Sequence, residues 1–176
     1  MIATLLALAS ACSWGVSDFL GGLMSRRLPT TTVMVISQAF GLVGIGIAFV
    51  ITGSSLPASE PMGYAIAAGA VGAIGLAAFY HALATGMVSL VAPIAATGAI
   101  VPVAVGLWEG EAVGFYGMAG IAAAIAGVIL ASVAPASPDD ATKVDPVARL
   151  TSIGLAVVAA VLFGAYFALF ARATTG

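Results

Sequence analysis

The sequence predicts an all-α protein that crosses a membrane about six times, and three observations support this fold class. Of the 176 residues, 62% are hydrophobic and only 7% are charged, whereas a soluble domain has about 25% charged residues. Six apolar stretches each approach the roughly 20 residues with which a helix crosses the hydrocarbon core. None of them alternates polar and apolar residues as barrel strands do, so we expect helices whose amides bond within each segment.

The composition also indicates which classes of partner and cofactor to expect. We expect a multi-pass integral protein of the cell membrane, with the lipid bilayer as its surroundings. A net charge of -2, with no basic cluster larger than Arg26 and Arg27, argues against nucleic acid as a main partner. The lone cysteine, Cys12, forms neither an internal disulfide nor a structural zinc site. We therefore expect no metal and no cofactor.

Missing motifs argue against an intramembrane enzyme. The sequence has no Gly-x-Ser-Gly with a suitably placed histidine and no His-Glu-x-x-His. No second acid within the apolar stretches pairs with Asp18 for acid and base chemistry. We expect no catalytic residues and a function other than catalysis.

The apolar stretches are joined by short connections, with one exception. The connection at residues 135–150 contains prolines, aspartates and a lysine, which makes it the one long polar segment and the natural internal boundary. No positive charge precedes the first stretch, so we expect it to remain as a membrane span rather than to be cleaved as a signal. The predicted spans are residues 2–23, 33–51, 62–83, 88–108, 113–134 and 151–171.

The first span carries the most informative residue, Asp18. A carboxylate within an apolar span costs at least about 2.5 to 3.5 kcal/mol, so it usually faces a cavity or a partner. One interpretation is that Asp18 binds a proton or a cationic group beside an aromatic wall formed by Trp14. The other is an interfacial acid, hydrated near Arg26 and Arg27. At about 100° per residue, Asp18 shares a polar stripe with Ser10, Ser13, Trp14, Ser17 and Gly21.

Polar side chains in the second and third spans each have two open interpretations. Gln38, next to Ser37, either contacts a substrate or makes a hydrogen bond between helices. His81 follows Tyr80 near the end of the third span. This histidine either titrates as part of the function or caps the helix end and bonds to a neighbour.

The fourth span is predicted to be broken. Pro93 and Pro102 each remove an intrahelical hydrogen bond, which frees a carbonyl and bends the helix. Ser89, Pro93 and Thr97 are spaced by four residues and so share one helix face. Broken helices within membranes commonly line a substrate cavity, because freed backbone must face protein or water. A kink that only fits the bundle is the alternative.

Small residues recur at helical spacing in several spans. Without a hydrophobic driving force in lipid, close approach through small residues supplies the contacts between helices. We expect these positions to be packing seams. They are Gly41 and Gly44 in the second span, Ala65, Gly69, Gly72, Ala73, Gly75 and Ala77 in the third, and Gly120, Ala123, Ala124 and Gly127 in the fifth.

The basic residues predict an orientation. Arg26 and Arg27 lie in the first connection and Lys143 and Arg149 in the fifth, which share one side of the membrane. Arg172 lies on the other side. Because basic loops stay in the cytoplasm, the N-terminus is predicted to lie outside.

Short motifs follow one another in a characteristic order. Residues 13–22 contain Trp-Gly and lead to Ser-Arg-Arg at 25–27, while residues 86–94 read Gly-Met-Val-Ser-Leu-Val-Ala-Pro-Ile. A Gly-Glu pair follows at 110–111 and a Gly-Val pair at 127–128. In this order and spacing the motifs resemble the drug/metabolite transporter superfamily, and specifically its EamA-type transporters.

This resemblance implies ten helices in two inverted five-helix repeats, with a substrate held between them. Residues 1–134 then form the first repeat, 135–150 a polar loop, and 151–176 the first helix of an incomplete second repeat. Phe163-Gly164 stands where Trp14-Gly15 stands in the first repeat. Relative to that pattern four helices are missing, so we expect a truncated or split form. Many relatives place both termini in the cytoplasm, contrary to the charge count.

The resemblance also implies a function. We expect a secondary transporter, or its N-terminal half, that moves a small metabolite or drug-like solute by alternating access, with a proton or ion as a possible coupling partner. The alternative is a non-transporting membrane scaffold, or a truncated half that needs a second half or a second copy of the chain. The predicted substrate-binding or coupling residues are Trp14, Ser17, Asp18, Gln38, Ser89, Pro93 and Thr97, with Tyr80 and His81 as secondary candidates.

Overall fold

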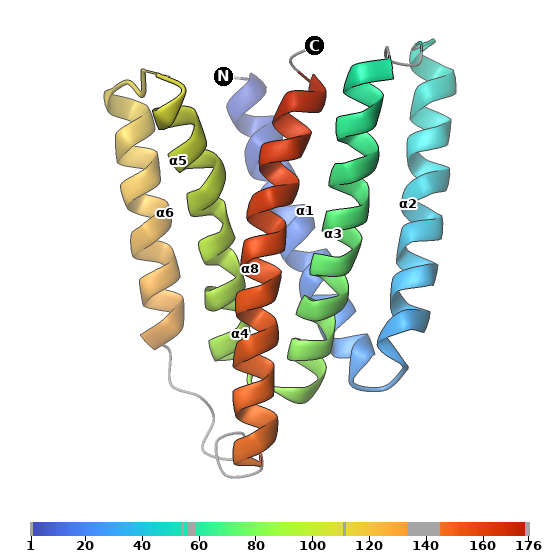
Figure 1. The fold of residues 1–176 in the computed structure, drawn as a ribbon, viewed down its shortest axis with the longest axis vertical. Helices are drawn as coiled ribbons and strands as arrows, with labels where there is room; N and C mark the ends of the chain where they lie inside the picture. The colour runs from blue at the N-terminus through green and yellow to red at the C-terminus, as the bar shows by residue number, and fades with distance from the viewer. Residues whose placement is uncertain (1, 54, 56–58, 111, 134–144, 175–176) are drawn as a thin grey trace.

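A computed structural model describes residues 2–53, 55, 59–110, 112–133 and 145–174. Within these ranges the chain is helical and contains no strand, and its helices stand side by side in one bundle (Figure 1). The elements are α1 (Ile2–Ser25), α2 (Thr30–Thr52), α3 (Ser59–Thr85), α4 (Val88–Ala96), the 3-10 turn η1 (Thr97–Ala99), α5 (Ile100–Trp108), α6 (Phe115–Val133) and α8 (Pro146–Thr174).

The helices have the length and exposure of membrane spans. Among the described residues, five segments are long and apolar enough to cross a bilayer, namely α1, α2, α3, the α4–α5 unit and α8, and α6 is a shorter apolar helix. Large apolar side chains face outward, as Phe40 and Val50 do on α2 with 76% and 79% of their surface exposed. Apolar exposure on this scale requires lipid around the bundle. The predicted all-α, multi-pass class is confirmed.

Local chemistry explains where several helices begin and end. Pro29 precedes α2, and Gly53 ends it in the left-handed conformation at φ 62°, which costs glycine little. At the start of α8, the Ala148 N–H donates to Asp145 Oδ2 at 3.3 Å, and Pro146 occupies the first helical position. Residues 146–150, which we assigned to the polar loop, therefore belong to the helix.

The fourth span is broken, as its two prolines predict. Helix α4 ends at Ala96, η1 makes a tighter turn over Thr97–Ala99, and α5 continues to Trp108. Pro102 lacks the N–H that would bond to the Gly98 carbonyl four residues earlier. That carbonyl oxygen faces Gly164 of α8, at 3.1 Å from the place where a Cβ at Gly164 would stand.

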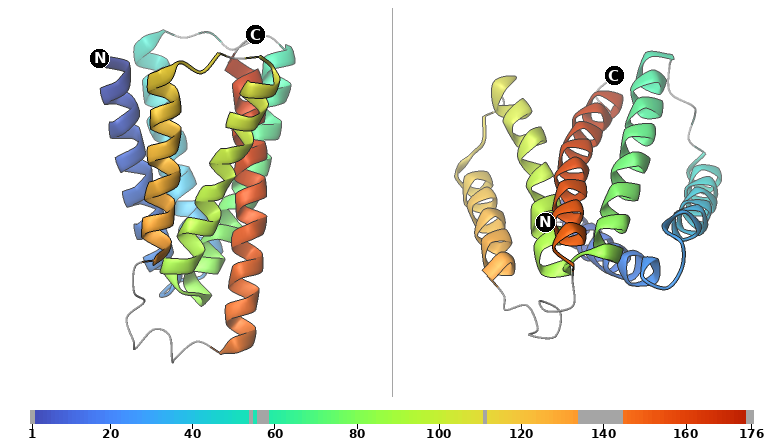
Figure 2. Two further views of the ribbon diagram at one scale, coloured as in Figure 1. Left: turned by 90° about the vertical axis from the view of Figure 1, so that its left-hand side faces the viewer. Right: turned by 60° about the horizontal axis from the view of Figure 1, so that its bottom comes forward.

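Helix α8 lies at the centre of the bundle, between α3 on one side and α4, η1 and α5 on the other (Figures 1 and 2). Its most extensive contact is with α3. Glycines allow the close approach: a Cβ at Gly72 would lie 2.8 Å from Tyr166 Cδ2, and one at Gly75 would lie 3.1 Å from Leu162 Cβ. These two glycines confirm part of the predicted seam.

The other glycines of the predicted seams do not meet a neighbouring helix within the described residues. A Cβ at Gly41, Gly44, Gly69, Gly120 or Gly127 would meet nothing within 4 Å. Spacing along a helix shows which small residues share a face, but it does not show which face meets a neighbour. On α3 that neighbour is α8, which meets the side carrying Gly72 and Gly75 rather than the side carrying Gly69.

The start of α1 and the end of α8 lie at one end of the bundle, and the α1–α2 connection, the α3–α4 turn and the start of α8 lie at the other (Figure 1). The connection with Arg26 and Arg27 and the start of α8 with Arg149 thus share one end. Arg172, in the last turn of α8, lies at the opposite end. This is the grouping expected from the sequence, with Lys143 outside the described residues. The direction of the bundle in the membrane remains a prediction.

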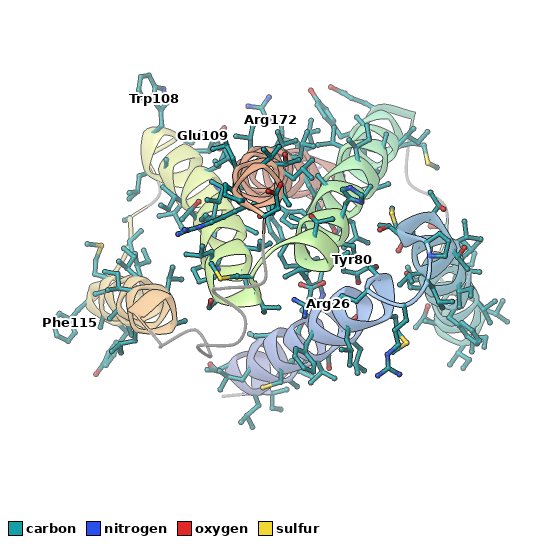
Figure 3. The ribbon with its side chains drawn as sticks, turned by 90° about the horizontal axis from the view of Figure 1, so that it is seen from below. Arg26, Tyr80, Trp108, Glu109, Phe115 and Arg172 are labelled. Carbon is teal, nitrogen blue, oxygen red and sulfur yellow. The ribbon has the colours of Figure 1, made fainter. Side chains whose placement is uncertain are left out.

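Arg172 and Glu109 form an ion pair at that opposite end, with Nη2 and Oε1 3.4 Å apart (Figure 3). Their side chains are 59% and 53% exposed, and pairs of this kind contribute at most about 1 kcal/mol. We expect Glu109→Gln to leave the thermal unfolding midpoint in detergent almost unchanged. A fall of many degrees would show that the pair fastens α5 to α8.

Candidate functional site

A cavity of about 590 Å³ lies between α1, α3, the α4–η1 segment and α8. We call it the Asp18 cavity, because Asp18 is the only ionisable side chain among the residues that line it. Small side chains make room on the α4–η1 side. They are Ala92, Ala95, Ala96 and Ala99.

Asp18 is half-buried and faces this cavity from the C-terminal half of α1. Its interactions run toward α3, where Tyr80 interacts with Ser17 and, electrostatically, with Asp18. Within the described residues no cation pairs with Asp18, since the ion pair formed there joins Arg172 to Glu109. The carboxylate therefore sits in an apolar cavity with a phenol beside it.

Aromatic rings line another part of the Asp18 cavity. Trp14 of α1 and Phe167 of α8 approach each other with ring centroids 6.0 Å apart. Phe79 of α3 meets Phe163 of α8 edge to face at 5.8 Å. These four rings and Phe19 all line the Asp18 cavity.

Sequence reasoning found Trp14 and Asp18 but missed the phenylalanines. A signal was present, because Phe163-Gly164 corresponds to Trp14-Gly15 in the repeat comparison. In the same correspondence Phe167 stands where Asp18 stands in the first repeat, four residues further along each helix. Two helices that present matching faces are expected to line one cavity between them.

One end of α1 is fastened to α3. A Cβ at Gly22 would lie 2.6 Å from Leu83 Cδ1, and the ring of Tyr80 fills the space next to Gly21. Just past α1, Arg26 donates from Nε to the Leu83 carbonyl and from Nη2 to the Gly86 carbonyl, both at 3.1 Å. We call this pair of hydrogen bonds the Arg26 clasp. In Figure 3, Arg26 and Tyr80 both lie between α1 and α3.

The Arg26 clasp is relevant to the second interpretation of Asp18, in which this residue is an interfacial acid hydrated near Arg26 and Arg27. Arg26 is bound to carbonyls at the end of α3, where a cation also complements the helix dipole. It is therefore not the counter-ion of Asp18. The carboxylate lines the Asp18 cavity, and both interpretations of its role stay predictions.

Three other predicted residues share α4 and η1 but do not line the Asp18 cavity. Ser89 is half-buried and Pro93 is buried. Thr97 is exposed, donates to the Ile94 carbonyl at 2.6 Å, and lines a separate apolar cavity of about 320 Å³ beside α6. The rotation of α4 is set by its packing on α8, which turns its alanines to Asp18. The spacing of Ser89, Pro93 and Thr97 showed that they share one face, but it did not show which way that face points.

The remaining candidates lie apart from the Asp18 cavity. Gln38 on α2 and His81 on α3 are both exposed and do not line it. Ser17 and Tyr80 line a neighbouring cavity of about 390 Å³ between α1, α2 and α3. The structure thus brings Trp14 and Asp18 together in one cavity and Ser17 and Tyr80 together in the next. Among the described residues, no three His, Cys, Asp or Glu side chains gather closely enough to hold a metal ion.

Comparison with known proteins gives one match. A sequence model of the EamA-like transporter family matches residues 1–133, whereas no curated protein and no solved structure matches the chain. The matched residues supply three walls of the Asp18 cavity, from α1, α3 and the α4–η1 segment. Members of this family are membrane transporters rather than enzymes, and the order of motifs in the sequence agrees with this match. The chain belongs to the EamA-like transporter family.

Proposed function

We propose that this chain is a secondary transporter, or the N-terminal half of one, that moves a small organic solute by alternating access. The observation that carries the proposal is the Asp18 cavity, which places one carboxylate among aromatic rings between α1 and the other helices. Its volume of about 590 Å³ falls within the roughly 300–1,000 Å³ of small-molecule sites. Asp18 and Trp14 are the proposed binding residues, and Asp18 is also the proposed coupling group.

The packing of α1 supports a rocking motion. Its extensive contacts are with α2 and α3, and the Arg26 clasp fastens one end of it. Across the cavity, the ring contact between Trp14 and Phe167 joins α1 to α8. We propose that α1 moves against the α3–α4–α8 group, opening the clasped end in one state and separating Trp14 from Phe167 in the other.

The break in the fourth span suits this motion. Where a helix changes to a 3-10 turn between two prolines, fewer backbone hydrogen bonds resist bending. Ala96 and Ala99, at the two sides of Thr97–Gly98, line the cavity. Bending there changes the width of the cavity without disturbing the central packing of α8 on α3.

Replacing Asp18 with asparagine is expected to lower solute flux at least about tenfold, which corresponds to about 1.4 kcal/mol. The full chain is reconstituted in vesicles and tested with a panel of metabolites and drug-like solutes. Glu60→Gln is the matched control, since Glu60 is an exposed acid in the first turn of α3, outside the cavity lining.

The outcomes separate the alternatives. Flux that falls in Asp18→Asn and persists in Glu60→Gln supports transport through the Asp18 cavity. Equal flux in native protein and Asp18→Asn contradicts the role of Asp18. A native chain that moves no solute, alone or with a second half supplied, contradicts transport and favours the scaffold alternative.

A further inference from the structure

Resting on the proposed function, we infer that the solute held in the Asp18 cavity is a lipophilic organic cation, with one positive charge on an aromatic or aliphatic body. The juxtaposition that supports this class is a carboxylate that forms no ion pair with any described residue, with aromatic rings around the same space. Each part selects a different property of the solute.

The charge of the cavity selects a cation. Asp18 is the only ionisable residue in the lining, and a carboxylate away from water is stabilised when a cation lies beside it. Arg26 is held by the Leu83 and Gly86 carbonyls. Arg172 pairs with Glu109 at the opposite end of the bundle from the clasp. Among the described residues, no cationic side chain therefore pairs with Asp18, so the solute can supply the positive charge.

The aromatic rings of the cavity favour a weakly hydrated cation. The face of an aromatic ring attracts a positive charge, most strongly for tryptophan, and the attraction grows when the cation has lost its water. Trp14 lies one helical turn before Asp18 on the same face of α1, and Phe167 lies 6.0 Å from Trp14 between ring centroids. A charged group next to Asp18 therefore contacts an aromatic surface as well.

The remaining lining disfavours other classes of solute. An anion is stabilised best by a basic side chain, and the described residues of the lining supply none. A sugar or another polyol requires many hydrogen-bond partners, but beyond the Asp18 carboxylate the polar side-chain group in the lining is the Trp14 indole N–H. A neutral apolar solute leaves the carboxylate desolvated and unpaired, which is costly.

Binding of tetraphenylphosphonium and of tetraphenylborate tests this inference, because the two ions have nearly the same size and shape and opposite charge. Binding to the purified full chain in detergent is measured by titration calorimetry. We expect saturable binding of tetraphenylphosphonium to the native chain and to Glu60→Gln, and none of tetraphenylborate. Asp18→Asn is expected to weaken cation binding at least about tenfold, whereas Asp18→Glu keeps the charge and retains most of the affinity.

The results distinguish a wrong substrate class from a wrong function. Equal binding of the cation to native protein and Asp18→Asn, or equal binding of the two ions, overturns the inference. If native vesicles then still move another solute, transport itself stands. Cation binding that requires the carboxylate, found in vesicles that move no solute, supports the site and overturns transport instead.

Discussion

Alanine in place of Gly98 is expected to destabilise the folded protein by about 1–3 kcal/mol, the usual cost of inserting an atom group into a packed contact. The new Cβ would overlap the Ala160 carbonyl oxygen and lie 3.2 Å from the Ala160 carbonyl carbon and Cα. These are backbone atoms of α8, so no side-chain rotation relieves the overlap. Helix α8 and the 3-10 turn must separate, which also displaces one wall of the Asp18 cavity.

Thermal unfolding in a single detergent measures this effect. Gly69→Ala is the matched control, because a Cβ there meets nothing within 4 Å and alanine favours a helix over glycine by up to about 1 kcal/mol. Gly164→Ala is expected to fall between them, since its Cβ would lie 2.7 Å from Cβ of the Val101 side chain. Equal unfolding midpoints for Gly98→Ala and Gly69→Ala would contradict the close crossing of η1 and α8.

The membrane fold and the broken helix were predictable because both follow from local chemistry. A chain with so few charged residues cannot cover itself with a polar surface in water, wherever its helices pack. Likewise Pro93 and Pro102 remove backbone donors in any tertiary arrangement. The resulting break appears as η1, between the two prolines.

A residue of the candidate site could be predicted only where its side chain differs chemically from the rest of its own helix. Asp18 is visible because a carboxylate is costly in an apolar span, and Trp14 because it lies one turn away. Phe79 resembles any other apolar residue of a membrane helix, so only the packing of α3 on α8 distinguishes it, whereas Phe163 and Phe167 could have been found only through the repeat correspondence with Trp14 and Asp18.

The rotation of the fourth span about its own axis could not be predicted from the sequence. Ser89 and Thr97 share a face of the fourth span, but the face turned to Asp18 carries alanines. That rotation is set by α8, whose Ala160 carbonyl fits against Gly98. A contact between residues so far apart in the chain leaves no periodic signal in either segment.

Replacing Arg26 with glutamine is expected to loosen the clasped end of α1. The two hydrogen bonds from the guanidinium are charge-assisted, and such bonds contribute about 1.5–3 kcal/mol each when they are shielded from water. Arg26 is exposed and its two hydrogen bonds are only partly buried, so we expect a loss of about 1–2 kcal/mol in total, or about tenfold in the population of the open end. The proposed alternating access requires this end to open, and Arg26→Gln is therefore expected to raise its opening rate.

A buried serine beside the clasp supplies the reporter. Ser25 is 8% exposed, and its hydroxyl has no hydrogen-bond partner among the described residues. We therefore expect Ser25→Cys to introduce a shielded thiol at the clasped end, which reacts when that end opens. The exposed Cys12 is first changed to serine. Thiol labelling in detergent is expected to be about tenfold faster with Arg26→Gln than without it, because labelling follows the open population. Arg27→Gln removes the same charge from the neighbouring position without touching the clasp, and equal labelling rates in the two arginine variants would show that loss of charge, rather than loss of the two hydrogen bonds, opens this end.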